Sequence, residues 1–160
     1  MPSEVWSASD LVTDVARQGG YITSVSRWNN GRWEAYIQRG DEPYGQDFPL
    51  EPGVGYILRG HLPVNWVASG FQITSPLPLS LKKGYNLVGV VSANFYSATS
   101  TIDAINSQAK EEVARTVTRF ESGLYEPLVK QKGEIYGEDY PIEKTRGYFI
   151  RVEEDINWTP

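Results

Sequence analysis

The sequence predicts an α+β or mainly β protein built from two similar units, each a small antiparallel sheet or partial barrel with one short helix. Three observations predict this fold class. The second half of the chain repeats the first, each copy contains a segment of helical apolar spacing, and a tight hairpin turn follows that segment in each copy. The 160 residues are 40% hydrophobic and 12% aromatic, which is enough for packed cores.

The internal repeat becomes visible when the chain is shifted by 92 positions, because Arg27 then aligns with Arg119. At the same shift, YGQDFPLE at 44–51 aligns with YGEDYPIE at 136–143. Further upstream, WSASDLVTDVARQ aligns with YSATSTIDAINSQ at a shift of 90 positions. So many matches in register indicate an internal duplication.

We therefore expect a first repeat unit at 1–70 and a second at 71–160. The second unit begins with segment 71–91, which has no counterpart in the first, since Pro2 aligns with Ser92. The first unit should then lack its N-terminal strand. Either segment 71–91 serves both units, or a neighbouring molecule fills the gap by strand addition, as in a strand-exchanged homodimer.

Each unit should contain one helix, which in the second unit follows the strands of segment 71–91. In the first copy Ser7 is the expected N-cap, with Asp10 three residues later, and Gly19 with the next glycine should end the helix. The apolar stripe of this helix consists of Leu11, Val12, Val15 and Ala16. In the second copy we expect Ser100 and Asp103 to take the same roles. Its stripe consists of Ile102, Ile105 and Ala109.

A two-residue hairpin follows each helix. Asn30-Gly31 and Ser122-Gly123 suit a turn in which both central residues have positive φ, and this turn fixes the pairing of the flanking strands. The expected rungs are Trp28 with Trp33, Arg27 with Glu34 and Val25 with Tyr36, then Phe120 with Tyr125, Arg119 with Glu126 and Val117 with Leu128. An aromatic pair and an ion pair thus recur at the same rungs in both units.

Further strands are expected after a loop in each unit, in GVGYILRG at 53–60 and in RGYFIRV at 146–152. In the latter, Tyr148 should share one face with Ile150 and Val152, while Phe149 and Arg151 lie on the other face. The stretch 79–91 should form two strands with a turn or bulge at Lys83-Gly84.

The stretch LKKGYNLVGVVSANFYSATSTIDAIN resembles the G-W-N-L-[VI]-[GS] units of large secreted and cell-surface bacterial proteins. In such units a glycine-aromatic-asparagine strand precedes a short helix, a hairpin and a Gly-Tyr strand. The resemblance covers the second unit and the remaining part of the first, and departs at Tyr85, where Trp is commoner. It implies a non-catalytic accessory module in an extracellular or cell-surface protein, and it supplies no catalytic residue.

Composition excludes several classes of function. The net charge of −5 and the single adjacent basic pair, Lys82-Lys83, argue against nucleic acid as a partner. The absence of cysteine excludes disulfides, thiolate metal sites and a cysteine nucleophile. No apolar run is long enough for membrane insertion, and the opening residues MPSEVWSASD carry no signal-peptide pattern.

Few residues suggest a catalytic, cofactor-binding or metal-binding role. The single histidine, His61, aligns with Glu153, so we expect a solvated loop residue rather than a catalytic one. No cofactor is expected, and no phosphate-binding loop is present. Calcium remains open, because acidic side chains gather in two loops, with Asp47 and Asp139 as alternative capping groups. The acidic residues of these loops are Asp41, Glu42, Asp47 and Glu51, then Glu134, Glu138, Asp139 and Glu143.

Aromatic residues are the strongest candidates for binding, since exposed rings stack on sugars or form protein contacts, although rings also fill cores. The candidate ligand-binding residues are Trp28, Trp33, Tyr36, Tyr44, Phe120, Tyr125 and Tyr136. The sequence therefore predicts a non-catalytic structural or interaction module, a spacer or adhesive scaffold within a larger secreted or surface protein. Its partners would be other surface proteins or a polysaccharide, and a carbohydrate-binding module is the alternative.

Overall fold

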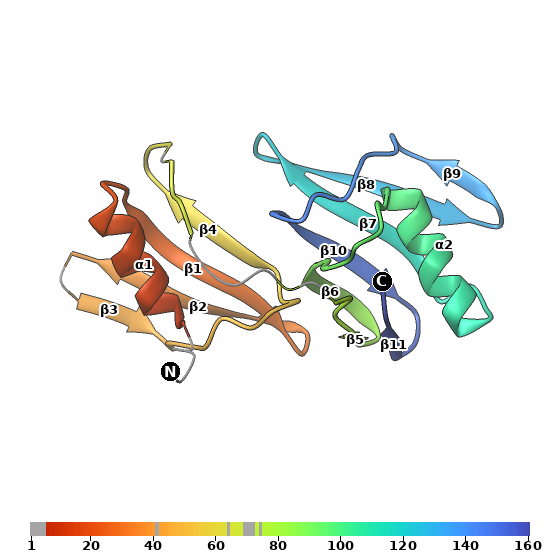
Figure 1. Cartoon of the computed structure of the whole chain (residues 1–160), viewed down its shortest axis with the longest axis horizontal. Helices are drawn as coiled ribbons and strands as arrows, with labels where there is room; N and C mark the ends of the chain where they lie inside the picture. Colours follow the sequence, from red (N-terminus) through yellow and green to blue (C-terminus); the bar gives the residue numbers. More distant parts are fainter. Residues whose placement is uncertain (1–5, 41, 64, 69–72, 74) are drawn as a thin grey trace.

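The computed structural model describes residues 6–40, 42–63, 65–68, 73 and 75–160 of the chain. Antiparallel strands dominate, with one helix in each half, which confirms the predicted α+β or mainly β class (Figure 1). In chain order the elements are α1 (Ala8–Arg17), β1 (Ile22–Asn29), β2 (Arg32–Arg39), β3 (Glu42–Gly45), β4 (Tyr56–Gly60), β5 (Leu79–Leu81), β6 (Gly84–Gly89), α2 (Ala98–Ala109), β7 (Ala114–Glu121), β8 (Leu124–Gln131), β9 (Glu134–Tyr136), β10 (Gly147–Val152) and β11 (Ile156–Trp158).

Two sheets of matching topology make up the two halves. The first has the strand order β3-β2-β1-β4, and the second has the order β6-β10-β7-β8-β9. Strands β1, β2, β3 and β4 correspond, at a shift of 92 positions, to β7, β8, β9 and β10. The second half also has a small two-stranded sheet of β11 and β5.

The hairpin registers are as predicted in both halves. Trp28 pairs with Trp33, and Phe120 pairs with Tyr125, with the remaining expected rungs in place. The turn residues adopt positive φ, which is 48° for Asn30 and 51° for Ser122. This geometry matches the right-handed twist of the flanking strands, so the turn alone fixes which side chains share a face.

Each sheet packs its helix against one face, and the described residues form two separate hydrophobic cores (Figure 1). The first core consists of Ala8, Leu11, Val12, Val15, Ile22, Val25, Tyr36 and Phe48. The second is larger and extends from Leu79 to Trp158, with Ile102, Ile105 and Ile150 fully buried at its centre. The boundary that the sequence predicts between 70 and 71 lies outside the described residues.

Both helices begin at a capping box, but the predicted start of the second was wrong. Ser7 caps α1 together with Asp10, as expected. In α2 the cap is Ser97, whose partner is Ser100, so the helix begins three residues before the predicted Ser100–Asp103 pair. The cause is that Ser97 is the true equivalent of Ser7 at the upstream shift of 90 positions, while Asp103 lies inside the helix.

Short strands went unpredicted in the stretches expected to be loops. Strands β3 and β9 extend the two hairpins into three-stranded meanders, and β11 pairs with β5. The second meander turns at Lys132-Gly133, where both residues have positive φ. Because β3 and β9 are short and almost wholly exposed, they carry no apolar alternation by which a sequence could reveal them.

Strand β6 connects the two halves. One of its edges pairs with β10, and its other edge contacts the residues just before β4. There the amide of Gly55 donates to the carbonyl of Leu87 at 3.0 Å, and the amide of Gly89 donates to the carbonyl of Gly53 at 3.0 Å. Strand β6 thus bonds to both halves, yet within the described part of the chain no strand pairs with the outer edge of β4.

Candidate binding surface

Aromatic rings from both halves meet at the tip of the first hairpin. Trp28 and Trp33 pack edge to face, with their ring centres 5.2 Å apart. The ring of Trp33 lies 6.0 Å from the ring of Phe149 in the second sheet. The indole nitrogen of Trp28 donates to the carbonyl oxygen of Tyr85 at 2.8 Å, which fixes the position of that indole against the second half.

The second sheet presents its rings on the face that points away from α2. Phe149 pairs with both Thr118 and Leu87, and Pro127 pairs with Thr118, so these side chains share that face. The ring of Tyr125 lies 5.9 Å from that of Phe149, and the ring of Tyr85 lies 6.5 Å from it on the other side. Phe149 is therefore the centre of a row of rings.

These rings line an open cleft of about 410 Å³, which we call the aromatic cleft. Its lining consists of Trp28, Trp33, Tyr85, Thr118, Tyr125, Pro127 and Phe149. Trp33 is 46% exposed and Tyr125 is 55% exposed, so both rings offer free surface to a ligand. Among the described residues, no carboxylate, histidine, lysine or arginine belongs to this lining.

A cavity of about 610 Å³ with a mixed polar and apolar lining adjoins the aromatic cleft and shares Trp28 and Tyr85 with it; we call it the polar cavity after its hydrogen-bonding groups. It lies between the first hairpin tip and the β5–β6 region. Its polar lining includes Asn29, Asn30, Glu51, Ser80, Lys82, Lys83, Asn86 and Asp155. Hydrogen-bonding groups therefore lie next to aromatic rings, the combination that polar ring-shaped ligands require.

The structure brings together some of the candidate residues that the sequence predicts and separates others. Trp28, Trp33 and Tyr125 meet in the aromatic cleft, and Phe120 contacts Tyr125 at 5.0 Å between ring centres. Tyr36 lies in the first core, where it is 9% exposed and its hydroxyl donates to Gln38, so the expectation that it offers a ring to a ligand was wrong. Its side chain points to the helix face because it pairs with buried Val25.

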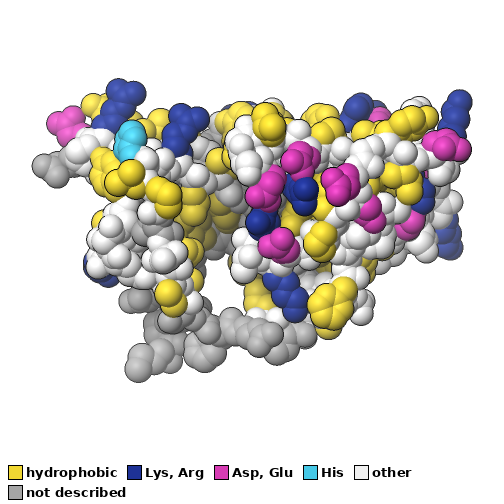
Figure 2. Space-filling model, turned by 90° about the horizontal axis from the view of Figure 1, so that it is seen from above, with side chains coloured by type: hydrophobic (Ala, Val, Ile, Leu, Met, Phe, Trp, Pro, Cys, Tyr) yellow, Lys and Arg dark blue, Asp and Glu magenta, His cyan; other side chains and the backbone are white. Residues whose placement is uncertain are grey.

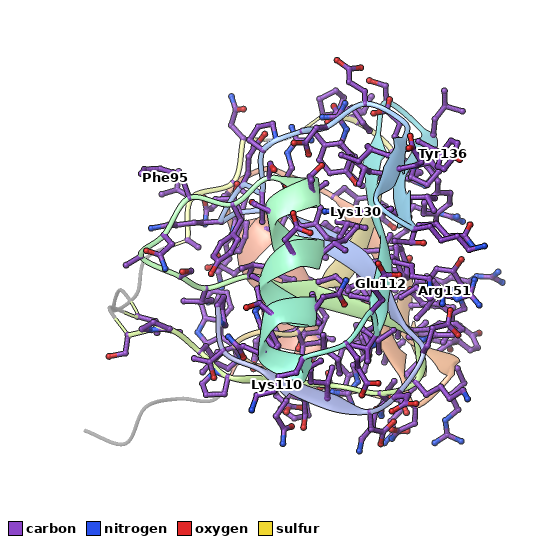
Figure 3. The ribbon with its side chains drawn as sticks, turned by 90° about the vertical axis from the view of Figure 1, so that its right-hand side faces the viewer. Phe95, Lys110, Glu112, Lys130, Tyr136 and Arg151 are labelled. Carbon is purple, nitrogen blue, oxygen red and sulfur yellow. The ribbon has the colours of Figure 1, made fainter. Side chains whose placement is uncertain are left out.

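Tyr44 and Tyr136 are exposed on the outermost strands of the two sheets, β3 and β9, outside the cleft lining. Figure 3 shows Tyr136 and Arg151 on the same side of the second sheet, with α2 on the other side. The guanidinium of Arg39 lies 5.9 Å from the ring centre of Tyr44. Both tyrosines are thus peripheral to the aromatic cleft.

Sequence reasoning missed Tyr85 and Phe149 as members of the binding surface. Phe149 was expected on the face opposite Tyr148, and that placement is correct. The alternation that buries Tyr148 and Ile150 therefore already indicated Phe149 as a binding residue, because it leaves the large Phe149 ring on the solvent face. For Tyr85, the only indication in the sequence was its place as the aromatic residue of the Gly-Tyr-Asn strand.

The acidic loops cap helices in the structure. The carboxylate of Asp47 accepts from the backbone amide of Ser9 at 3.0 Å and from its hydroxyl at 2.6 Å. Asp139 accepts from the amide of Thr99 at 3.0 Å. Partial desolvation alone would raise the pKa of each carboxyl group, but these hydrogen bonds outweigh it and hold both pKa values below their usual range.

Two further acids of these loops form ion pairs. Glu51 accepts from Arg27, and Glu143 pairs with Arg146. Across the described part of the chain, no three side chains of Asp, Glu or His gather closely enough to hold a metal ion. Asp41, one of the residues considered for calcium, lies outside the described residues.

His61 is exposed and stacks on Tyr21 with ring centres 5.9 Å apart. Figure 2 shows acidic and basic side chains interspersed on one face of the second half, with no large patch of one sign. Of the two helices described, neither has the length and apolar character that crossing a membrane requires. Comparisons of the chain with protein-family models, with curated proteins and with solved structures give no match.

Proposed function

We propose that this chain is a non-catalytic interaction module, and that the aromatic cleft is its binding surface. One observation carries the proposal: five rings from two repeated halves converge on an open apolar cleft whose described lining holds no charged group. Exposed apolar surface of this kind favours a binding role, because isolated exposed rings need no explanation but a convergent set does.

The module would belong to a larger secreted or cell-surface protein, where it acts as a spacer or an adhesive scaffold. Support comes from the duplication and from the resemblance of the second unit to accessory units of such proteins. A partner protein would place an apolar side chain between Trp33 and Tyr125, two exposed rings of the cleft lining.

Carbohydrate binding is the second candidate, favoured by the polar cavity that shares Trp28 and Tyr85 with the aromatic cleft. A sugar ring stacked on Trp33 would direct its hydroxyl groups toward the amide and ammonium groups of that cavity. Polysaccharide binding and protein binding therefore predict different ligands for the same surface, and these can be tested side by side.

The test is a parallel screen of a glycan array and a peptide array with the whole chain, followed by titration of any binder. Trp33→Ala and Tyr125→Ala should each weaken binding at least about tenfold, the loss typical of an interface anchor. Tyr44→Ala removes an equally exposed ring outside the cleft and should leave the affinity unchanged. A binder that is indifferent to both cleft substitutions, or hydrolytic turnover in a substrate screen, would refute the proposal.

A further inference from the structure

Leu58 on β4 and Ile150 on β10 occupy equivalent positions, 92 residues apart, but their surroundings differ. Leu58 is 43% exposed, whereas Ile150 is 0% exposed. Strand β6 covers the outer edge of β10, while among the described residues nothing pairs with the outer edge of β4. The first unit therefore leaves open a position that the second unit fills.

A hollow of about 510 Å³ runs beside this open edge. Its lining consists of Val15, Ile22, Leu58, Gly60, His61, Leu62, Pro63 and Trp66. The equivalents of four of these residues are Ile105, Ala114, Ile150 and Trp158, all of them buried. Val15 and Ile22 are buried in the first unit as well, so the two copies differ at Leu58 and Trp66, which are less buried than their equivalents.

The second unit shows which side chains fill the equivalent space. Leu79 and Leu81 of β5 and Val88 of β6 belong to the same buried core as Ile150 and Trp158. Leu79 pairs directly with Trp158, and Val88 lies on the strand that pairs with β10. In the first unit Trp66 is only partly buried and lies outside any strand, since it has no β5 equivalent to pair with in the described structure.

The corner between β5 and β6 depends on particular residues. The side chain of Asn86 accepts from the amide of Lys82 at 2.8 Å and donates to the carbonyl of Lys82 at 2.7 Å. Gly84, at the start of β6, has a φ of 99°, which a side chain would strain. A segment that reproduces this corner needs glycine, an aromatic residue and asparagine in that order.

We propose that the outer edge of β4 and the hollow beside it form a docking site for a segment of another polypeptide that has the sequence pattern of Leu79–Gly89. The segment adds antiparallel to β4, as β6 adds to β10. In the register of β6 with β10, its counterpart of Asn86 lies opposite Leu58 and its counterpart of Val88 lies opposite Tyr56. Its two leucines enter the hollow next to Val15 and Trp66. This site lies beyond the aromatic cleft and shares no lining residue with it.

The test uses the whole ¹⁵N-labelled chain and a synthetic peptide with the sequence of residues 77–91, LPLSLKKGYNLVGVV. Saturable binding should slow amide hydrogen exchange in β4 by about tenfold or more, because strand addition protects edge amides. A peptide with proline in place of Val88 should not bind, since proline lacks an amide donor. In the chain, Leu58→Asp should abolish binding, while Arg59→Gln, on the opposite face of β4, should not affect it.

A fusion protein tests the proposal independently of whether the Leu58 variant folds. A second copy of residues 77–91 placed directly before Pro2 reproduces the spacing found in the second unit, and it should raise the melting temperature and protect the β4 amides. Unchanged exchange in the fusion together with no peptide binding up to about 1 mM would overturn the proposal. A dimer that protects β4 without peptide would also overturn it, because a second copy would then be the occupant.

Discussion

The guanidinium carbon of Arg27 lies 4.5 Å from the centre of the Phe48 ring. The same side chain donates to Glu34 at 2.8 Å across the hairpin. Arg119 repeats this arrangement in the second unit, 4.4 Å from the ring of Tyr140. The ring and the carboxylate hold each guanidinium at the edge of the core, so the ion pair contributes to packing as well as to charge.

Arg27→Met should therefore lower the free energy of unfolding by about 2 kcal/mol, because it leaves the largely buried carboxylate of Glu34 without its main donor. Arg32→Met is the matched control: Arg32 also contacts Glu34, at 3.5 Å, but its side chain is largely exposed. The control should cost no more than about 0.5 kcal/mol. Urea unfolding of both variants measures the difference, and equal losses would contradict this account.

Acid should destabilise the helix starts through Asp47 and Asp139. Because their pKa values in the folded state lie below those in the unfolded state, their contribution is complete above the unfolded value and is lost as the pH falls through the folded value. Asp47→Asn and Asp139→Asn should each cost about 1 kcal/mol at neutral pH, as expected for loss of a cap.

At about pH 3, below the ordinary pKa of an aspartate, the difference between each variant and the wild type should shrink, because the unfolded wild-type chain then binds protons that the folded carboxylate binds only at lower pH. Urea unfolding at both pH values checks this. Glu138→Gln is the control, since the carboxylate of Glu138 accepts no hydrogen bond from the described residues; it should have little effect at either pH. A loss that does not depend on pH would mean that the aspartates act only through packing.

Three glycines at the junction between the units should tolerate alanine to different degrees. A Cβ on Gly55 would lie 2.8 Å from the side chain of Leu87 and 3.0 Å from the backbone nitrogen of Val88. A Cβ on Gly147 would meet its nearest neighbours at 3.4 Å, and one on Gly89 at 3.7 Å. None of the three has a positive φ, so steric contact alone should set the order.

Gly55→Ala should cost about 2 kcal/mol, Gly147→Ala less, and Gly89→Ala close to nothing. Calorimetry is the suitable measurement, because a disturbed junction should also split the unfolding of the two units into separate transitions. The reverse order of stability would show that the junction is set by contacts other than these.

Lys110 ends α2 in the left-handed conformation, with a φ of 62° (Figure 3). Lys110→Gly should raise the melting temperature, with a gain of about 0.5–1 kcal/mol, since glycine adopts this conformation without steric penalty. Lys83→Gly is the control at a position without positive φ, and it should be slightly destabilising. Thermal unfolding followed by circular dichroism distinguishes the two, and a loss of stability in the Lys110 variant would count against the capping argument.

The parts of the fold that local chemistry determines could be predicted from the sequence. The Asn30-Gly31 turn fixes its own strand register, and Ser7 with Asp10 marks a helix start. The start of α2 was misplaced because Ser100 and Asp103 imitate a capping pair within the helix itself. Strands β3 and β9 have no burial pattern of their own, so nothing local indicates them.

The candidate site was predictable only in part. The pairing of Trp28 with Trp33 follows from the turn, but the meeting of both with Phe149 depends on how the halves join. That join includes two backbone hydrogen bonds at Gly53–Gly55 and a bond from the Trp28 indole to the backbone of Tyr85, and a backbone partner leaves no residue-specific signal in a sequence. Tyr36 was wrongly included among the exposed rings. Its predicted pairing with Val25 already implied that its side chain faces the core.

Gly55 and Gly147 are copies of one ancestral position, and the structure sets them back to back, with 3.4 Å between a Cβ on Gly147 and the Cα of Gly55. Elsewhere the two copies have been free to diverge, as Trp28 and Phe120 have done. At this position a larger side chain in either copy would contact the backbone of the other copy. The duplicated halves therefore share an evolutionary constraint that neither would have experienced as a single unit.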